Sequence, residues 1–223
     1  MTARRIAAIC LLVLCAGCAG QPHYIDFDGG MAAYKSQTAS LEIGALLFEQ
    51  LADPSTHKFT VDQNDPMVVF PDDGKSYVKA FTLPVTTADY HLVIRSYTLV
   101  HGFTGTGLYY PLVTFLDADK KPISTTSAAD LKLQWGGVGS DEPDEPARVK
   151  IDIAITPQSQ ARYLVIHTEQ KWVETGFKEP LDHPPPPAWA FAMVGVVALT
   201  MNSVSFPSSP IGPLEISLQD KPS

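Results

Sequence analysis

Residues 149–155 read Val-Lys-Ile-Asp-Ile-Ala-Ile. Apolar side chains at every second position alternate with Lys150, Asp152 and Ala154, and such alternation is typical of a β-strand with one buried face and one face in water. A little further on, residues 163–166 read Tyr-Leu-Val-Ile without alternation, which predicts a strand buried on both faces. The two stretches together predict a fold of packed β-sheets.

Further candidate strands show either the same alternation or a short apolar run bounded by turn residues. They are 58–61, 67–70, 77–83, 90–99, 109–116, 131–135, 194–201 and 214–218. About ten short strands with frequent turn signals predict an all-β fold, an antiparallel β-sandwich of jelly-roll-like type. No strand alternates with a long helical segment, which argues against a parallel α/β sheet.

Composition excludes several classes of protein. The 223 residues carry a formal net charge of −8, whereas a dedicated nucleic-acid binder needs a basic face. Cysteines occur at positions 10, 15 and 18 and nowhere later. The folded part therefore has no disulfide, no thiolate zinc site and no cysteine nucleophile.

The N-terminus resembles an export signal. Arg4 and Arg5 precede the apolar run 6–14, a charged segment and a short hydrophobic segment in the order of a secretory signal peptide. The sequence Leu14-Cys15-Ala16-Gly17-Cys18 is similar to the bacterial lipoprotein box, which predicts lipidation of Cys18. The alternative is an ordinary signal peptide cut near residues 19–20.

The lipoprotein interpretation fixes the expected compartment and the domain boundaries. Two or three acyl chains hold a protein firmly to a membrane. Ala19 follows the cysteine, where proteobacterial lipoproteins of the inner membrane usually have aspartate, so we expect a periplasmic protein anchored to the outer membrane. We expect a signal peptide over 1–17, a lipidated cysteine with a flexible tether over 18–37, and one β-sandwich domain over 38–223, which opens with a short helix or turn in 41–51.

Three later stretches interrupt the strand pattern. Residues 136–146 contain an acidic run and 182–187 are rich in proline, so both are expected to be loops. Residues 188–201 form the most apolar segment after the signal. They are too few to span a membrane as a helix and lack the polar face of a membrane-lying helix, so a core strand is the favoured interpretation.

No motif for catalysis or metal binding is present. The histidines at 23, 57, 91, 101, 167 and 183 have no metal-ligand spacing, and neither a nucleophile elbow nor a P-loop occurs. Residues 102–107 are glycine-rich and predict a hairpin loop. Asp117 and Asp119 could begin a calcium loop, but the spacing favours a plain turn. We therefore expect no cofactor, no metal and no enzymatic activity.

Aromatic side chains are the remaining candidates for ligand contact, because sugars stack their C–H faces on such rings. The candidates are Tyr109, Tyr110, Trp135, Trp172 and Trp189. Aromatic rings also fill sandwich cores, so each has a purely structural alternative.

Three segments resemble the maltose-operon periplasmic protein family (MalM). The first is 111–117, Pro-Leu-Val-Thr-Phe-Leu-Asp, with Pro122 beyond it. The second is Thr156-Pro157 followed by 163–169, Tyr-Leu-Val-Ile-His-Thr-Glu, and the third is Gly-Pro-Leu at 212–214. Their order and spacing carry the resemblance over about residues 40–218.

This resemblance implies a periplasmic, non-enzymatic protein encoded with maltose and maltodextrin uptake genes, an accessory or binding module whose candidate partners are maltodextrin and an envelope protein. It supplies no catalytic residues. The alternative function is a structural adaptor that docks on another envelope protein.

Overall fold

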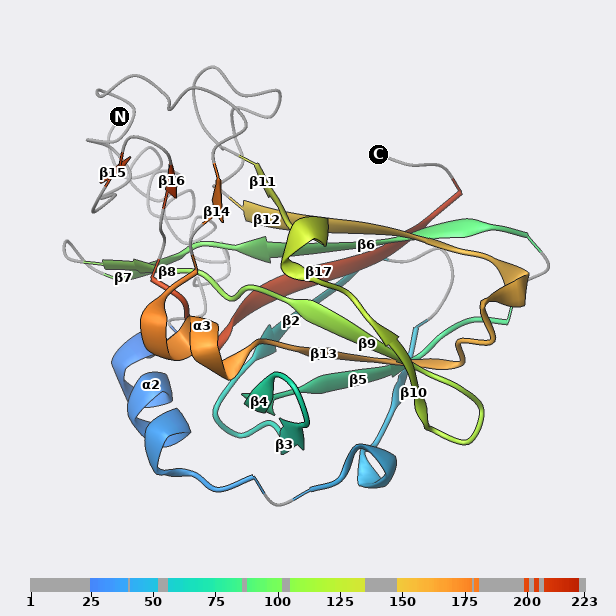
Figure 1. The fold of residues 1–223 in the computed structure, drawn as a ribbon, viewed down its shortest axis with the longest axis horizontal. Coiled ribbons are helices and arrows are strands. Elements are labelled where there is room, and N and C mark those ends of the chain that lie inside the picture. The colour runs from blue at the N-terminus through green and yellow to red at the C-terminus, as the bar shows by residue number, and fades with distance from the viewer. Residues whose placement is uncertain are drawn as a thin grey trace, which may run out of the picture.

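The computed structural model describes residues 25–39, 41–51, 56–85, 88–101, 105–134, 148–177, 179–180, 199–200, 203–204 and 207–220. Two five-stranded sheets pack face to face as a β-sandwich (Figure 1), which confirms the predicted fold class. We name each sheet by its central strand. The β13 sheet has the order β1 (Glu49–Gln50), β5 (Lys79–Thr82), β13 (Tyr163–His167), β9 (Leu112–Leu116), β10 (Pro122–Thr125). The β6 sheet has the order β11 (Lys132–Gln134), β12 (Arg148–Ile155), β6 (Tyr90–Tyr97), β17 (Gly212–Gln219), β2 (His57–Val61).

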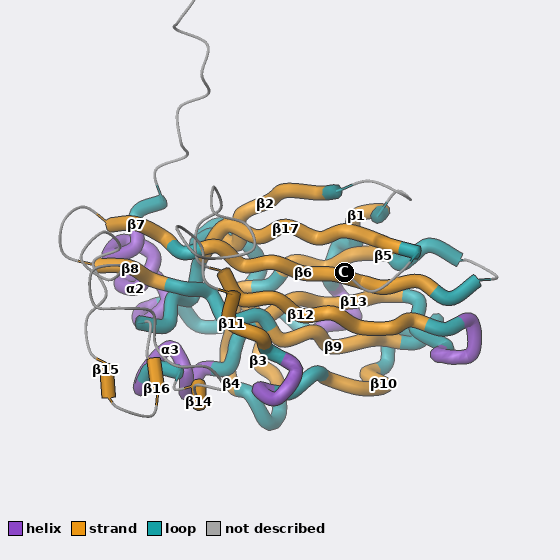
Figure 2. The backbone as a smooth tube through the Cα atoms, turned by 90° about the horizontal axis from the view of Figure 1, so that it is seen from above, coloured by secondary structure: helices purple, strands orange, loops and turns teal. Residues whose placement is uncertain are grey.

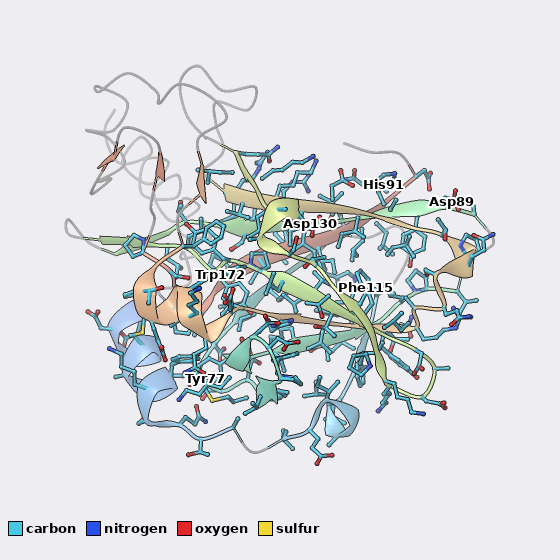
Figure 3. The ribbon with its side chains drawn as sticks, viewed as in Figure 1. Tyr77, Asp89, His91, Phe115, Asp130 and Trp172 are labelled. Atoms are coloured by element: carbon cyan, nitrogen blue, oxygen red, sulfur yellow. The ribbon has the colours of Figure 1, made fainter. Side chains whose placement is uncertain are left out.

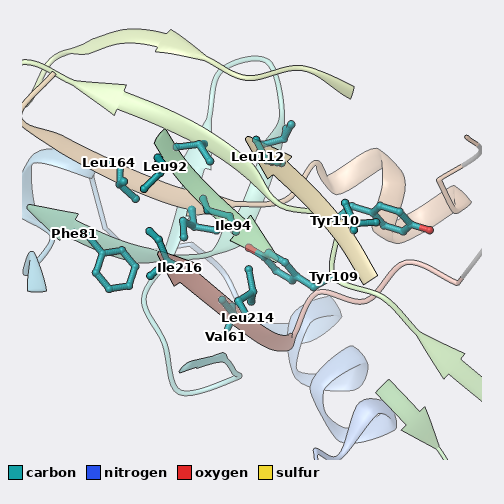
Figure 4. Packing of buried hydrophobic residues seen from close by; sticks show 14 of the residues in the cluster. Val61, Phe81, Leu92, Ile94, Tyr109, Tyr110, Leu112, Leu164, Leu214 and Ile216 are labelled. Atoms are coloured by element: carbon teal, nitrogen blue, oxygen red, sulfur yellow. The ribbon is translucent and has the colours of Figure 1, made fainter. Parts of the chain in front are cut away.

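The β6 sheet has one apolar face and one polar face. Strand β6 pairs antiparallel with β12 on one side and with β17 on the other. Leu92, Ile94 and Ile151 are completely buried and point into the space between the sheets (Figure 4 labels the first two). The neighbours His91, Arg95, Lys150 and Asp152 are polar, as the alternation predicts, but Val93 is apolar and completely buried and Lys150 is only 6% exposed, so this face is not open to water over its whole area.

The centre of the β13 sheet is buried on both faces, whereas its edge strands β1 and β10 are exposed. Leu164 and Ile166 belong to the core between the sheets, whereas Val165 belongs to a second cluster on the other side. That side is covered by the hairpin of β3 (Met67–Phe70) and β4 (Gly74–Tyr77), together with the segment around Leu46. Two buried faces explain why residues 163–166 show no alternation.

A helix occupies most of the expected tether. Helix α2 (Phe27–Ser36) begins at Asp26, whose Oδ1 accepts a hydrogen bond from the Gly29 N–H at 3.0 Å. Tyr34 is 2% exposed and its hydroxyl donates to the Lys75 carbonyl at 2.7 Å. Residues 27–36 are therefore part of the folded domain, and the expected flexible tether does not extend over them.

The remaining elements are short. They are β7 (Leu99–His101), β8 (Gly105–Gly107), α3 (Gln170–Thr175), β14 (Glu179–Pro180), β15 (Leu199–Thr200), β16 (Ser203–Val204) and the 3-10 turns Ile43–Ala45, Ala128–Asp130 and Pro157–Ser159. Strands β7 and β8 form the hairpin expected at the glycine-rich loop. The turn at 43–45 agrees with the short helix or turn expected there, the expected strand 77–83 is divided between β4 and β5, and helix α3 was not expected.

Several expectations concern residues outside the described ranges. These are the signal peptide with Cys18, the loops 136–146 and 182–187, and most of 188–201, of which β15 is the described part. None of the helices within the described ranges is both long enough and apolar enough to span a bilayer.

Candidate functional site

Three of the five aromatic candidates lie in the core instead of on a surface. Tyr109 and Tyr110 precede β9 and are 0% and 2% exposed, and Trp172 in α3 is 8% exposed. The Tyr110 ring lies 4.5 Å from Phe177, which in turn lies 4.8 Å from Trp172, between ring centroids. Figure 4 shows the Tyr109 ring beside the core residues Ile94 and Leu214 and the Tyr110 ring directed toward α3, which carries the Trp172 labelled in Figure 3. A sugar stacks on a ring face only if it can reach it, so the structure does not present these three rings to a ligand.

The other two aromatic candidates, Trp135 and Trp189, and the lipidation candidate Cys18 lie outside the described residues. Their proposed roles stay predictions.

Two histidines of the described part, His91 and His167, take structural positions. His91 Nδ1 lies 2.8 Å from Asp152 Oδ1 at the surface of the β6 sheet. His167 is completely buried in β13 and its Nε2 lies 2.9 Å from Thr114 Oγ1. Within the described ranges no three His, Cys, Asp or Glu side chains gather into a group able to hold a metal.

A polar hollow of about 560 Å³ opens at one end of the sandwich. Most of its lining residues are polar. They come from the β9–β10 turn and from the connection between β12 and β13: Asp117, Ala118, Asp119, Pro157, Gln158, Gln160 and Arg162. Carboxylates, amides and a guanidinium supply both acceptors and donors within one small volume. The hollow is suited to a ligand rich in hydroxyl groups and not to an apolar one.

Backbone hydrogen bonds fix the walls of the polar hollow. The Arg162 N–H donates to the Leu116 carbonyl at 2.8 Å, which joins the start of β13 to the end of β9. Asp117 Oδ1 accepts from the N–H groups of Asp119 and Lys121 at 2.8 and 2.9 Å. One carboxylate oxygen therefore closes the turn, as the plain-turn interpretation predicts. Gln160 has a left-handed backbone with φ of 57° and directs the chain from the 3-10 turn toward β13.

The second candidate surface is the outward side of the β6 sheet, which we call the polar face. Glu215 accepts a hydrogen bond from Arg95 Nη1 at 2.9 Å and another from the Tyr97 hydroxyl at 3.2 Å, and Lys58 Nζ lies 3.7 Å away. Asp152 lies between His91 and Lys150, whose Nζ is 3.3 Å from its Oδ2. These pairs hold the side chains of the polar face in fixed places.

Electrostatics keep the Asp152 carboxylate ionised. Burial by itself raises the pKa of Asp152, but hydrogen bonds from His91 and Lys150 act in the opposite direction and bring the pKa below its usual value. Burial and the neighbouring Glu215 raise the pKa of Tyr97, so that phenol stays protonated and can donate. The polar face is thus a fixed set of charges and donors near neutral pH.

Sequence reasoning found neither surface. Arg95, Lys150 and Asp152 are visible as the polar members of alternating strands, yet only the register shows that they meet. The polar hollow combines residues from the β9–β10 turn and from the connection between β12 and β13, and a local pattern carries no such information.

Comparison with known proteins gives one family. The family model described as "Maltose operon periplasmic protein precursor (MalM)" matches residues 73–185, about half of the chain. The matched segment runs from β4 to beyond β14 and includes every residue of the polar hollow. No curated protein matches the chain, and no solved structure matches it.

Proposed function

Because the chain belongs to the maltose operon periplasmic protein (MalM) family, we propose that it is a lipid-anchored, non-catalytic accessory protein of maltodextrin uptake that binds sugar in the polar hollow. The family match is the observation that carries the proposal, since the family is described as periplasmic and as belonging to a maltose operon. This match agrees with the resemblance seen in residues 111–117 and 163–169.

The chemistry of the hollow supports a sugar as ligand. Each hydroxyl of a maltodextrin both donates and accepts, and a planar amide or carboxylate can engage two neighbouring hydroxyls together. Gln158 and Gln160 contribute amides to the lining and Asp119 contributes a carboxylate. Sugar recognition at this site uses hydrogen bonds and does not require the buried rings of Tyr110 and Trp172.

The positions of the carboxylates support binding without hydrolysis. Glycoside hydrolysis requires two carboxyl groups that flank the scissile bond from opposite sides. Asp117 and Asp119 lie within one turn, and one oxygen of Asp117 is occupied by backbone N–H groups. A bound maltodextrin would therefore leave the hollow unchanged.

The proposed lipid anchor places the hollow away from the membrane. Cys18 precedes the start of α2 at Phe27 by nine residues, a reach of at most about 32 Å. Helix α2 and the β9–β10 turn lie toward opposite ends of the sandwich (Figure 2). The end with α2 would face the membrane, and the polar hollow would face the periplasm, where a sugar arrives.

Calorimetric titration with maltodextrins of increasing length tests the proposal. A saturable heat of binding is expected for the wild-type protein, and Gln158→Ala should weaken binding by roughly tenfold because it removes a hydrogen-bonding amide from the hollow. Gln63→Ala is the matched control, since Gln63 is also exposed but lies in the β2–β3 turn. No heat of binding with any maltodextrin, from folded protein, would overturn sugar binding.

A further inference from the structure

A second hollow opens at the same end of the sandwich as the polar hollow. We call it the small hollow, because its volume is about 110 Å³. Its lining comes from the chain before β6, the start of β6 and the end of β17: Pro84, Asp89, Tyr90, Leu218, Gln219 and Asp220. Figure 3 labels Asp89 at this end of the sandwich, where β6 begins and β12 ends. Residues far apart in the sequence therefore form two neighbouring hollows.

On one side, strand pairing joins the two hollows. Tyr90, which lines the small hollow, lies directly opposite Ile155 in the pairing of β6 with β12. Pro157 follows Ile155 by two positions and lines the polar hollow. One strand spacing and two residues of chain thus separate the Cα atoms of Tyr90 and Pro157, a distance of at most about 13 Å.

On the other side, a backbone hydrogen bond joins the two hollows. The Leu83 N–H donates to the Arg162 carbonyl at 2.9 Å. Arg162 lines the polar hollow, and Pro84, the residue after Leu83, lines the small hollow. The end of β5 and the start of β13 are therefore held together between the hollows, and the sheets fix where one hollow lies relative to the other.

The lining of the small hollow suits part of a sugar. Asp89 and Asp220 are exposed, and among the described residues no hydrogen bond or ion pair engages either carboxylate. Carboxylates accept hydrogen bonds from hydroxyl groups. Tyr90 and Leu218 are each 8% exposed and belong to the core. Apolar groups as well as carboxylates thus line the small hollow, as a ring with both C–H and hydroxyl groups requires.

Its size indicates that the small hollow acts together with the polar hollow. A site for a complete small ligand usually has about 300–1,000 Å³. The polar hollow, at about 560 Å³, lies within this range, whereas the small hollow is too small to hold such a ligand alone. We infer that the small hollow is a second subsite for the sugar chain bound in the polar hollow, an inference that rests on the proposed function. The ligand is then a maltodextrin longer than maltose, with one part in each hollow.

A chain that occupies both hollows gains affinity from its length. Once one part of the chain is bound in the polar hollow, binding of the next part in the small hollow is intramolecular, so the second contact adds to the affinity. Maltose in the polar hollow makes no such second contact. Affinity should therefore rise from maltose to maltoheptaose, and each protein molecule should bind one long chain.

Calorimetric titration of the full-length protein, solubilised in a detergent that carries no sugar, compares the two ligands. The wild type should bind one maltoheptaose per molecule, at least about tenfold more tightly than maltose. Asp89→Ala should weaken maltoheptaose binding by roughly fivefold, the effect of one hydrogen bond, and should leave maltose binding unchanged. Asp220→Ala, in the same hollow, should act in the same way.

Asp72→Ala is the matched control for Asp89→Ala. It removes a carboxylate that is also exposed and changes the net charge equally, but Asp72 lies in the β3–β4 turn, so both sugars should bind as they do to the wild type. Equal affinity for the two sugars, two maltoheptaose molecules per protein, or equal binding by Asp89→Ala and Asp72→Ala would overturn the second subsite alone. No heat of binding with either sugar would overturn the proposed function, and the second subsite with it.

Discussion

The ring of Phe70 stacks on the ring of His167, with centroids 3.8 Å apart and planes inclined by 13°. Phe70 belongs to the β3–β4 hairpin and His167 to the end of β13. The stacking therefore joins the hairpin to the sheet that it covers, and it seals the imidazole from water. Burial lowers the pKa of His167 from 6.5 to about 3.

Acid should destabilise the protein through this histidine. The unfolded chain binds a proton at His167 below about pH 6.5, whereas the folded chain does not until the pH approaches 3. Because the unfolded state binds more protons in this interval, the free energy of unfolding falls as the pH falls. Between pH 7 and pH 4 the loss should be roughly 3 kcal/mol.

Urea denaturation of the wild type and of His167→Gln at both pH values measures that effect. The carboxylates titrate in both proteins, so their contribution cancels in the comparison. The variant should lose about 3 kcal/mol less than the wild type over the same interval. Equal losses would show that His167 is not sealed in the folded state.

Val165 should be indispensable to the second core cluster. It is completely buried between β13 and the hairpin, and an unpaired buried carboxylate costs several kcal/mol. Val165→Asp should therefore abolish cooperative thermal unfolding. Val69→Asp is the matched control, because Val69 lies in the hairpin that covers Val165 but is 60% exposed. The melting temperature of this variant should stay near that of the wild type. Similar melting of the two variants would contradict the assignment.

The strands were predictable because burial leaves a period in the sequence. Residues 149–155 alternate because β12 has one apolar face and one polar face, whereas 163–166 do not alternate because both faces of β13 are apolar and buried. The ion pair between Arg95 and Glu215 was not predictable, because the two residues are 120 positions apart and meet only through the order of the strands. Aromatic residues give no such period, so the sequence favoured core packing for Tyr110 and Trp172 but left ligand contact open as an alternative.

The sequence of helix α2 contains a weak helical pattern, and two glycines within it obscured that pattern. Phe27, Met31 and Tyr34 recur at helical spacing after the capping residue Asp26, but glycines in a helix interior lower its propensity. Tertiary contacts compensate for that loss. Gly30 lies so close to Ile211 that an added Cβ would come within 2.3 Å of its side chain, so the glycine permits the helix to pack.

Tyr34 should hold α2 to the domain. Its hydroxyl donates to Lys75, and Lys75 Nζ in turn donates to the carbonyls of Tyr34 and Gln37 at 2.6 and 2.9 Å. Tyr34→Phe should cost about 1 kcal/mol, the value of one hydrogen bond, whereas Tyr34→Ala should cost roughly 3 kcal/mol or more. Hydrogen exchange should be slow in residues 30–36 of the wild type and fast in Tyr34→Ala. Fast exchange in both proteins would support the predicted flexible tether instead of a docked helix.

Membrane attachment should depend on a single sulfur atom. Lipidation requires Cys18, so Cys18→Ala should move the protein from the membrane fraction to the soluble periplasmic fraction. Cys15→Ala is the control, because it changes the neighbouring cysteine of the signal and leaves the acceptor in place. Unchanged fractionation of Cys18→Ala would refute the lipid anchor.

The anchored protein should hold its α2 end toward the membrane. Phe27 follows Cys18 by nine positions, which span at most about 32 Å, less than the roughly 40 Å diameter of a domain of this size. With the proposed lipid on Cys18, and because no cysteine follows it, Ser36→Cys and Asp119→Cys can each be labelled singly with a fluorophore. In vesicles that contain nitroxide-labelled lipid, quenching should be strong at position 36 and weak at position 119, in the polar hollow. Cleavage between residues 18 and 27 by an engineered protease site should abolish the difference. Equal quenching at both positions before cleavage would mean that the domain tumbles freely on its anchor.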